Sequence, residues 1–380
     1  MSELKELPPL SDLKIAVFND FDAARPHWLE LEKTGSYFAF QSYDWLANWY
    51  QFIGQHETEQ LCIASVCSGK TPLMLMPFII RRQHGLRILC WAGGIVTDYQ
   101  APLLAAATDK ITRHQWPALW ASIKSQLPPF DAARLLNQPE HIDAVENPFL
   151  WLQKLPYAES HAALIGSDWN SYYQSKVKKR IRQDSRRQRK RLAEIGEVSF
   201  VVAENPQQAE QFTRAMIEQK RRRYHETGVT DILAADSYQQ FYLSGGQRLI
   251  EQGKGHICAL LVDDQVVATH WGILQGRRFY FLMPTYAGED WKRYSPGRIL
   301  LEELMQWCIR EGYDVFDFSL GGEQYKQEWC NQQMPLYETL DANSIKGHLY
   351  LLLQGFKRRL LENPQIFRQA MKLRHWLQNR

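Results

Sequence analysis

Residues 294–329 contain a helix, a strand and a polar turn in close succession, and this order constrains the fold more than any other stretch. Ser295 is a suitable N-cap, and Pro296 suits the first helical position because its missing N–H has no partner there anyway. Apolar residues then recur at helical spacing until Gly312, a residue type that ends helices. Residues 314–318 follow as a short buried strand. The stretch predicts a helix packed beside a strand, as in an α/β protein.

Ionisable residues gather where this predicted strand ends. Asp317 is followed, within a few residues and after two glycines, by Glu323, Tyr325 and Lys326. A glycine turn with ionisable side chains, beside a helix whose first N–H groups are free, can bind an anionic cofactor and transfer protons. The alternative is an ordinary αβ unit with a polar connection.

Several motifs in the same order resemble one family. The stretch reads S-P-G, then G-Y-D-V-F-D-F, then G-G-E-Q-Y-K-Q-E-W, and earlier segments read YFAFQSYDWLANWY, WAGGIVTDYQAPLL and VVATHWGILQGRRFYFLMPTY. Together they resemble the GNAT-type acyltransferases called CelD/BcsL-like or BioF2-like, relatives of the FemABX peptidyltransferases. The resemblance covers residues 35–340 and is more specific for the family than for the substrate.

Length and composition agree with a globular protein of two domains. The chain has 380 residues, of which 45% are hydrophobic and 23% charged. Six cysteines show no CxxC spacing, which predicts free thiols in a reducing compartment and no metal site. The first residues lack the apolar core of a signal peptide, and no apolar run reaches the roughly 18 residues of a membrane span. We expect a cytoplasmic protein.

The predicted elements divide the chain into two halves and a tail. Residues 1–165 read as mixed α/β. Residues 166–342 begin with one helix from about residue 169 to 195, on which Val177, Ile181 and Leu192 mark a thin apolar stripe. Further helices, a three-strand meander with tight turns at residues 263–264 and 275–276, a helix and more strands follow. This second order is similar to that of a GNAT domain, and the first half resembles a degenerate copy. The expected fold is therefore α/β, with tandem GNAT-like domains around central mixed sheets, plus a basic helical extension at residues 343–380.

The resemblance also implies a donor site. GNAT domains hold the pyrophosphate of coenzyme A with a basic, glycine-rich loop that leads into a helix. Here that position holds Arg293, Ser295, Gly297 and Arg298. The positive charge is present, whereas the full glycine-rich loop is absent and Pro296 removes one donor. The expected co-substrate is an acyl-coenzyme A or acyl-carrier protein, although FemABX relatives use aminoacyl-tRNA.

Three residues are candidates for the general base. His270 lies in a predicted strand and has a suitable ordinary pKa, but a lone histidine on an apolar strand is usually a core residue. Asp317 lies between two phenylalanines and would be partly buried, with Lys326 as its candidate ion-pair partner. Glu323 lies on the turn beside Tyr325, within reach of a substrate. We favour Glu323 or Asp317 over His270.

Positive charge is concentrated in one segment. Residues 176–191 hold ten Lys or Arg and one Asp, a local charge of +9 against +3 for the whole chain. Such an element favours an anionic partner: tRNA, a phosphorylated substrate or an acidic membrane surface. The alternative is a solvated helix that pairs with the acidic remainder of the chain. Residues 220–223 add a second basic cluster, expected on the same face.

The resemblance implies an acyltransferase acting on an amine or hydroxyl of a sugar, lipid or cell-envelope intermediate, with an acyl thioester as donor. One alternative is a FemABX-like transferase that uses aminoacyl-tRNA. Another is a GNAT-fold binding module that has lost the chemistry. The missing glycine-rich loop favours the binding module, whereas the retention of Asp317, Glu323, Tyr325 and Lys326 together argues against it.

Overall fold

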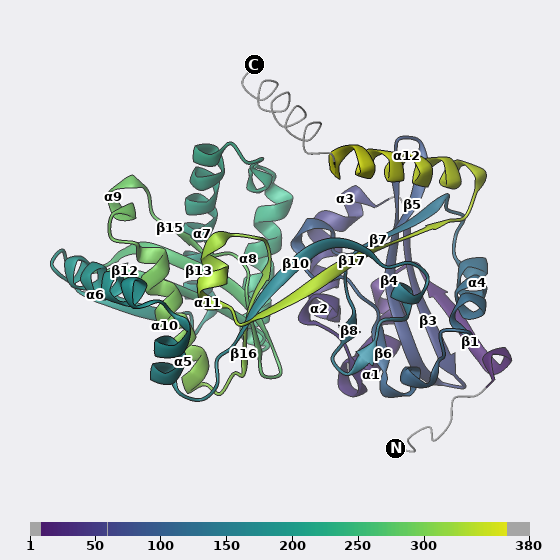
Figure 1. Ribbon diagram of the computed structural model, residues 1–380, viewed down its shortest axis with the longest axis horizontal. Coiled ribbons are helices and arrows are strands. Elements are labelled where there is room, and N and C mark those ends of the chain that lie inside the picture. Colours follow the sequence, from purple (N-terminus) through teal and green to yellow (C-terminus); the bar gives the residue numbers. More distant parts are fainter. Residues whose placement is uncertain (1–8, 59, 363–380) are drawn as a thin grey trace.

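The computed structural model describes residues 9–58 and 60–362, which form two lobes that lie side by side (Figure 1). The first lobe contains β1 (Leu13–Phe18), α1 (Phe21–Thr34), β2 (Gly35–Ser36), α2 (Tyr43–Trp49), α3 (Gln55–Glu57), β3 (Gln60–Ser68), β4 (Thr71–Gln83), β5 (Leu86–Trp91), β6 (Leu103–Ala105), α4 (Trp116–Gln126), β7 (Ala132–Pro139), β8 (His141–Ile142), β9 (Val145–Glu146), a 3-10 turn (Pro148–Trp151) and the beginning of β10 (Leu155–Leu164).

The second lobe follows without a long linker. It contains α5 (Trp169–Lys176), α6 (Lys179–Ala193), β11 (Val198–Val202), α7 (Pro206–Thr227), α8 (Asp236–Glu251), β12 (Gly255–Val262), β13 (Gln265–Gln275), β14 (Arg278–Phe281), β15 (Thr285–Tyr286), α9 (Glu289–Lys292), α10 (Pro296–Arg310), β16 (Val315–Leu320), α11 (Gln324–Trp329) and the beginning of β17 (Gln332–Ala342). A final helix, α12 (Ile345–Glu362), returns to the first lobe.

The two lobes repeat one order of elements. Each has a strand, two main helices, a three-strand meander, a helix and a strand parallel to the last strand of the meander. In the first lobe β5 pairs in parallel with β7, and in the second β14 pairs in parallel with β16. This repeat confirms the predicted α/β class and the tandem arrangement.

The last strand of each half helps to join the sheet of one lobe to that of the other. β10 pairs with β16 of the second lobe, β17 pairs with β7 of the first, and β10 and β17 pair with each other. The strand order is therefore β1-β3-β4-β5-β7-β17-β10-β16-β14-β13-β12-β11, one continuous sheet through both lobes. The divisions proposed at residues 165 and 342 follow chain order, and β17 crosses from the second half into the sheet of the first (Figure 1).

One helix predicted from the sequence is divided into two helices in the structure. The single helix expected from residue 169 to 195 is broken between α5 and α6, where Val177 is extended with ψ 126° and its side chain is buried. Arg182 donates from its guanidinium to the carbonyl oxygens of Tyr173 and Gln174, which ends α5 by satisfying its last acceptors. The tail prediction is described only as far as α12, and residues 363–380 lie outside the described residues.

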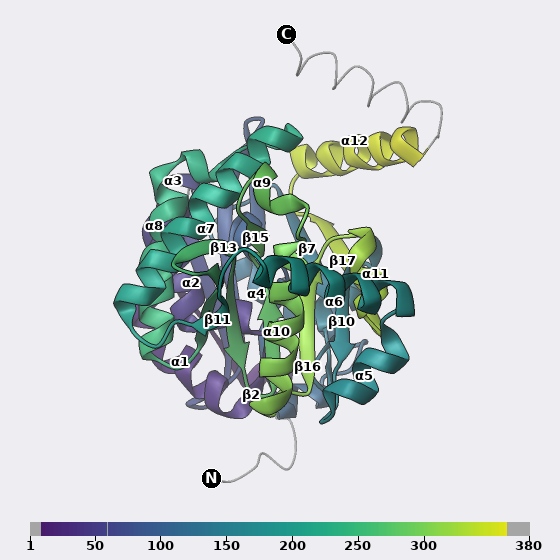
Figure 2. The same ribbon diagram turned by 90° about the vertical axis from the view of Figure 1, so that its left-hand side faces the viewer.

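Two apolar cores flank the second lobe's part of the sheet. α7 and α8 cover one face, and their core is continuous with that of the first lobe through contacts such as the Trp45 ring on Phe241. α5, α6 and α10 cover the other face (Figure 2). Within the described ranges, no helix has both the length and the apolarity that a membrane span requires.

Candidate functional site

A cavity opens in the second lobe where two parallel strands separate. β14 and β16 pair over only three positions, from Arg278↔Val315 to Tyr280↔Asp317. Beyond them lies a cavity of about 460 Å³ between the end of β14, the start of α10 and α11. Its lining residues are Phe281, Pro284, Thr285, Tyr286, Lys292, Ser295, Pro296, Gly297, Arg298, Leu301, Tyr325, Glu328 and Trp329.

The predicted donor residues meet this cavity with one exception. Ser295, Gly297 and Arg298 line it, and so does the predicted Tyr325. Arg293 is not among the described lining residues; its guanidinium lies over the Tyr294 ring, 4.9 Å from the centroid. Lys292, one residue earlier, lines the cavity instead.

The start of α10 differs from a simple capped helix. Pro296 opens the helix as predicted, and Ser295 precedes it, but Ser295 has φ +52° and its side chain caps no described N–H group. The carbonyl oxygen of Ser295 accepts from the N–H groups of Arg298 and Ile299. Because Pro296 has no N–H, few backbone donors remain for an anion, and positive side chains must supply most of the attraction.

Arg298 joins the cavity to the basic helix α6. Its guanidinium donates to Asp184, which also accepts from Arg187. A second cavity of about 560 Å³ is lined by Arg180, Ile181, Gln183, Asp184, Arg187 and Arg298. Arg298 therefore lines both cavities, and positive charge extends from the start of α10 onto α6.

Part of the predicted basic surface is paired inside the chain. Arg189 of α6 forms ion pairs with Glu302 and Glu303 of α10. The second cluster, residues 220–223, was expected on the same face; instead α7 and α6 cover opposite faces of the sheet. The arginines of that cluster form ion pairs with Asp231 and Glu226.

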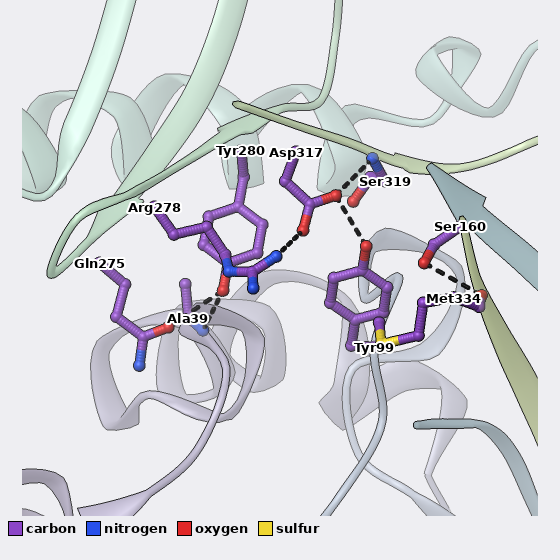
Figure 3. Close-up of polar contacts among 9 residues, drawn as sticks. All are labelled: Ala39, Tyr99, Ser160, Gln275, Arg278, Tyr280, Asp317, Ser319 and Met334. Atoms are coloured by element: carbon purple, nitrogen blue, oxygen red, sulfur yellow. Dashed lines mark hydrogen bonds and ion pairs between the residues drawn. The ribbon is translucent and has the colours of Figure 1, made fainter. Parts of the chain in front are cut away.

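Asp317 is the centre of a buried polar network (Figure 3). Its side chain is fully buried, Tyr99 Oη of the first lobe donates to Oδ1 at 2.7 Å, and Arg278 donates to Oδ2 at 2.7 Å. The backbone N–H of Ser319, whose φ is +59°, also donates to Oδ1 at 2.8 Å. Burial, and then the charge of Asp317, raise the pKa of Tyr99 well above its ordinary value, so this tyrosine stays a donor.

The expected ion pair between Asp317 and Lys326 is wrong. Tyr280 is directly opposite Asp317 in the parallel ladder, so Arg278, two residues earlier in β14, projects from the same face of the sheet. This brings a guanidinium 39 residues distant in sequence to the carboxylate. With both oxygens engaged, Asp317 positions the β16 end and the Tyr99 loop.

Glu323 and Lys326 form their own pair. Lys326 Nζ lies 3.0 Å from Glu323 Oε2, and it also donates to the carbonyl oxygen of Leu320. Burial acts to raise the pKa of Glu323, but the charge and hydrogen bond of Lys326, together with the charge of Lys220, outweigh burial and the net shift is downward. Lys220 of α7 lies near the pair, and burial lowers its pKa. Glu323 is therefore ionised at neutral pH and is a weak base.

Asp98 is an acidic residue near the end of β16 that the sequence analysis did not single out. It lies in the loop after β5, and its charge interacts with Lys326 and with polar groups of Ser319 and Leu320 at the end of β16. Burial raises the pKa of Asp98 to about 6, although those groups favour its charged form. The signal available in the sequence was the dipeptide Asp98-Tyr99 after two glycines, within the WAGGIVTDYQAPLL motif.

His270 does not line the cavity; it lies in the core of the second lobe, behind the lining residue Phe281. Its ring stacks on Phe281 at 4.6 Å, and neither ring nitrogen has a hydrogen-bond partner among the described residues. Burial lowers its pKa well below the ordinary value, so the ring is neutral. His256, Cys258 and His270 bring potential metal-ligand atoms within 4.8 Å of one another. Burial raises the pKa of the Cys258 thiol, which disfavours the thiolate that a metal would need.

A known family model matches the second lobe, and solved structures share the fold of the chain. Residues 179–327 match the family model described as an acetyltransferase (GNAT) domain. Among solved structures, the chain is similar to FemX, with a TM-score of 0.58 and 9% identity over 89% of this chain and 99% of that one. It is also similar to a conserved protein of unknown function from Bacteroides thetaiotaomicron, with a TM-score of 0.54 and 10% identity over 87% and 100% of the two chains. No curated protein matches it.

Proposed function

The chain is a GNAT-superfamily transferase of acyl groups, and we propose that it moves an acyl group from a thioester to an amine or hydroxyl acceptor that binds between the lobes. The observation that carries this proposal is the cavity at the separation of β14 and β16, with basic side chains at one side and Asp98 of the other lobe near the β16 end. We place this activity in the cytoplasm, where reducing conditions keep the six free cysteines as thiols.

The donor is an acyl-coenzyme A or an acyl-carrier protein. Its acyl thioester lies in the 460 Å³ cavity, whose apolar wall includes Leu301 and Trp329. Its phosphate groups contact Lys292 and Arg298 and extend toward the second cavity on α6. On this proposal the anionic partner of the basic helix is the phosphorylated part of the donor, and charge-assisted contacts replace the missing glycine-rich loop.

The chemistry needs a base and an acid. The acceptor attacks the thioester carbonyl, its proton passes to a base, and the carbon–sulfur bond breaks as the leaving thiolate takes a proton. Asp98 is the proposed base, because a pKa of about 6 leaves it ionised yet basic at neutral pH. Tyr325 lines the cavity, burial raises its pKa, and it is the proposed acid.

The remaining predicted residues have supporting roles in this proposal. Asp317, held by Arg278 and Tyr99, fixes the loop that carries Asp98. Lys326, which is paired with Glu323, places a positive charge near Asp98. The pair also makes the proposed acceptor-binding side polar. The acceptor class is an amine or hydroxyl on a sugar, lipid or cell-envelope intermediate, and the polar groups around Asp98 suit such a nucleophile.

The donor test is a thermal-shift titration with coenzyme A, short- and long-chain acyl-coenzyme A, acyl-carrier protein and bulk tRNA. A ligand at 100 times its dissociation constant adds about 2.7 kcal/mol to stability. Arg298→Gln should weaken thioester binding about tenfold, while Arg293→Gln, which alters an arginine outside the cavity lining, should not. Stabilisation by tRNA alone, abolished by salt, would identify an aminoacyl-tRNA donor, and no shift with any ligand would favour a binding module.

The base is tested by the pH dependence of transfer. In the wild-type protein kcat/KM should rise as pH increases through about 6, because Asp98 then loses its proton. Asp98→Asn should remove this rise, which is the acid limb of the pH–rate profile, and lower the rate by roughly 100-fold or more. Glu323→Gln is the matched carboxylate control and should keep the limb. An Asp98→Asn enzyme with an unchanged profile would exclude Asp98 as the base.

A further inference from the structure

The helix α12 lies against the first lobe with one face only (Figure 1). Gly347 and Tyr350 of α12 are buried on the face that meets the lobe, and a Cβ at Gly347 would overlap the carbonyl oxygen of Asp131. The glycine therefore allows α12 to approach the start of β7 closely, and Tyr350 packs with Ile88 and Ala132. This contact fixes which face of the helix points away from the protein.

The outward face of α12 is apolar. Ile345 is 90% exposed, and Leu349, Leu352, Leu353 and Phe356 are each at least 60% exposed. At about 100° per residue these five positions fall within an arc of roughly 100°, opposite Gly347 and Tyr350. We call these five residues the outward stripe. Other large exposed apolar residues of the described chain are scattered over several elements, so the stripe is a concentrated patch.

Positive charge accompanies the outward stripe. The residues of α12, 345–362, contain four Lys or Arg and one Glu. Lys346 and His348 occupy exposed positions on either side of the stripe at helical spacing. An apolar stripe on a basic helix matches the interface of a bilayer, where apolar side chains enter the acyl region and cations meet anionic headgroups.

We propose that α12 binds the surface of an anionic lipid bilayer, with the outward stripe inserted and the helix axis parallel to the membrane. A lipid surface fits better than an acidic protein, because five adjacent apolar side chains need an extended apolar partner as well as negative charge. Binding would hold the chain at the membrane without a spanning helix. It is independent of the donor and acceptor proposed above.

The test is sedimentation of the full chain with vesicles of phosphatidylcholine alone and of phosphatidylcholine with 30% phosphatidylglycerol (about one anionic lipid in three). The wild-type protein should bind the anionic vesicles at least tenfold more tightly. Leu352→Ser combined with Leu353→Ser should weaken this binding at least tenfold. Ile195→Ser combined with Val229→Ser, two exposed apolar residues elsewhere, is the matched control and should bind as wild type.

Other partners for the outward stripe would give different results in these experiments. Light scattering that shows a dimer, dissociated by Leu352→Ser with Leu353→Ser, would identify a second copy of the chain and overturn the proposal. Failure of the wild-type protein to bind anionic vesicles, or equal binding by the stripe variant, would also overturn it. Circular dichroism and melting temperature of each variant show whether a loss of binding reflects unfolding, and Phe356→Ser provides a second stripe variant.

Discussion

The two lobes share one order of elements but differ in how the region beside their two parallel strands is filled. In the second lobe a cavity of about 460 Å³ opens beyond the short pairing of β14 and β16, between the end of β14, α10 and α11. In the first lobe the corresponding region beside β5 and β7 is filled by aromatic rings. The ring centroid of Phe149 lies between 5.0 and 5.9 Å from those of Phe78, Trp91, Trp116 and Trp120.

The helix that follows the separation differs as well. α10 of the second lobe begins beside Lys292 and Arg298, which face the cavity. α4 of the first lobe begins with the buried Trp116, and Arg113 nearby is paired with Glu146. The second lobe therefore has an open cavity lined by basic residues, whereas the corresponding region of the first, which we call the scaffold lobe, is filled by aromatic rings. The scaffold lobe still contributes Asp98 and Tyr99 to the end of β16.

The largest expected effect comes from opening the filled lobe. Phe149→Ala removes a fully buried ring and should lower the free energy of unfolding by about 3–5 kcal/mol. Because no predicted donor-binding residue lies in this lobe, the affinity for the thioester donor should not change. Chemical denaturation and donor titration measure the two quantities. A new donor site in the variant would show that the lobes differ only by the aromatic filling.

A smaller effect of opposite sign is expected at Asp98. The pKa of Asp98 is raised from 3.8 to about 6 on folding, so its stabilising contribution is present below pH 3.8 and is lost as pH rises through 6. Asp98→Asn should therefore stabilise the protein at pH 7.5 by up to about 3 kcal/mol, and hardly at pH 4. Urea denaturation at both pH values measures this. Equal gains at the two pH values would rule out titration as the cause.

The contact between the lobes should be worth less. Tyr99→Phe removes the hydroxyl that donates to the buried Asp317, and should cost about 1.5–3 kcal/mol, as for hydrogen bonds to charged groups. The same change should lower the transfer rate, because it loosens the loop that carries Asp98. Tyr157→Phe is a suitable control, since that tyrosine is 44% exposed. Unchanged stability would show that the lobes are positioned by their strands alone.

The smallest effect tests the open cavity. Gly297 lines it, and a Cβ there meets only Tyr286 at an ordinary 3.6 Å, so a larger side chain can extend into the space. Gly297→Leu should weaken donor binding about tenfold, which is about 1.4 kcal/mol, with little loss of stability. Gly297→Ala controls for the backbone and should bind nearly as wild type. Normal donor binding by the Gly297→Leu variant would show that the donor does not bind in this cavity.

Local sequence signals predicted much of the fold. Pro296 and Gly312 bracket α10 closely, and the tight turns of the meander separate β12, β13 and β14 where expected. The break at Val177 was not predicted, because it involves contacts from the Arg182 side chain to backbone carbonyl oxygens of α5, which helical spacing alone does not reveal. Helical spacing also placed Ile181 and Leu192 correctly on the buried side of α6.

The site was harder to predict, because its residues meet only in the folded chain. Arg278 reaches Asp317 through a parallel pairing that no local pattern encodes, and Lys326 was closer in sequence. Asp98 comes from the other lobe, more than 200 residues from Asp317. Their proximity depends on strands that cross between the lobes, which a reading of each segment alone does not reveal.

The crossing strands also determine when this protein can complete its fold during synthesis. β7 (Ala132–Pro139) has β5 on one side, but its other neighbour is β17 (Gln332–Ala342), which leaves the ribosome about 200 residues later. At synthesis rates of about 5–20 residues per second the edge of β7 stays open for roughly 10–40 s. An unpaired edge is a template for wrong pairing, so we expect the nascent first lobe to be most prone to misassembly in this interval.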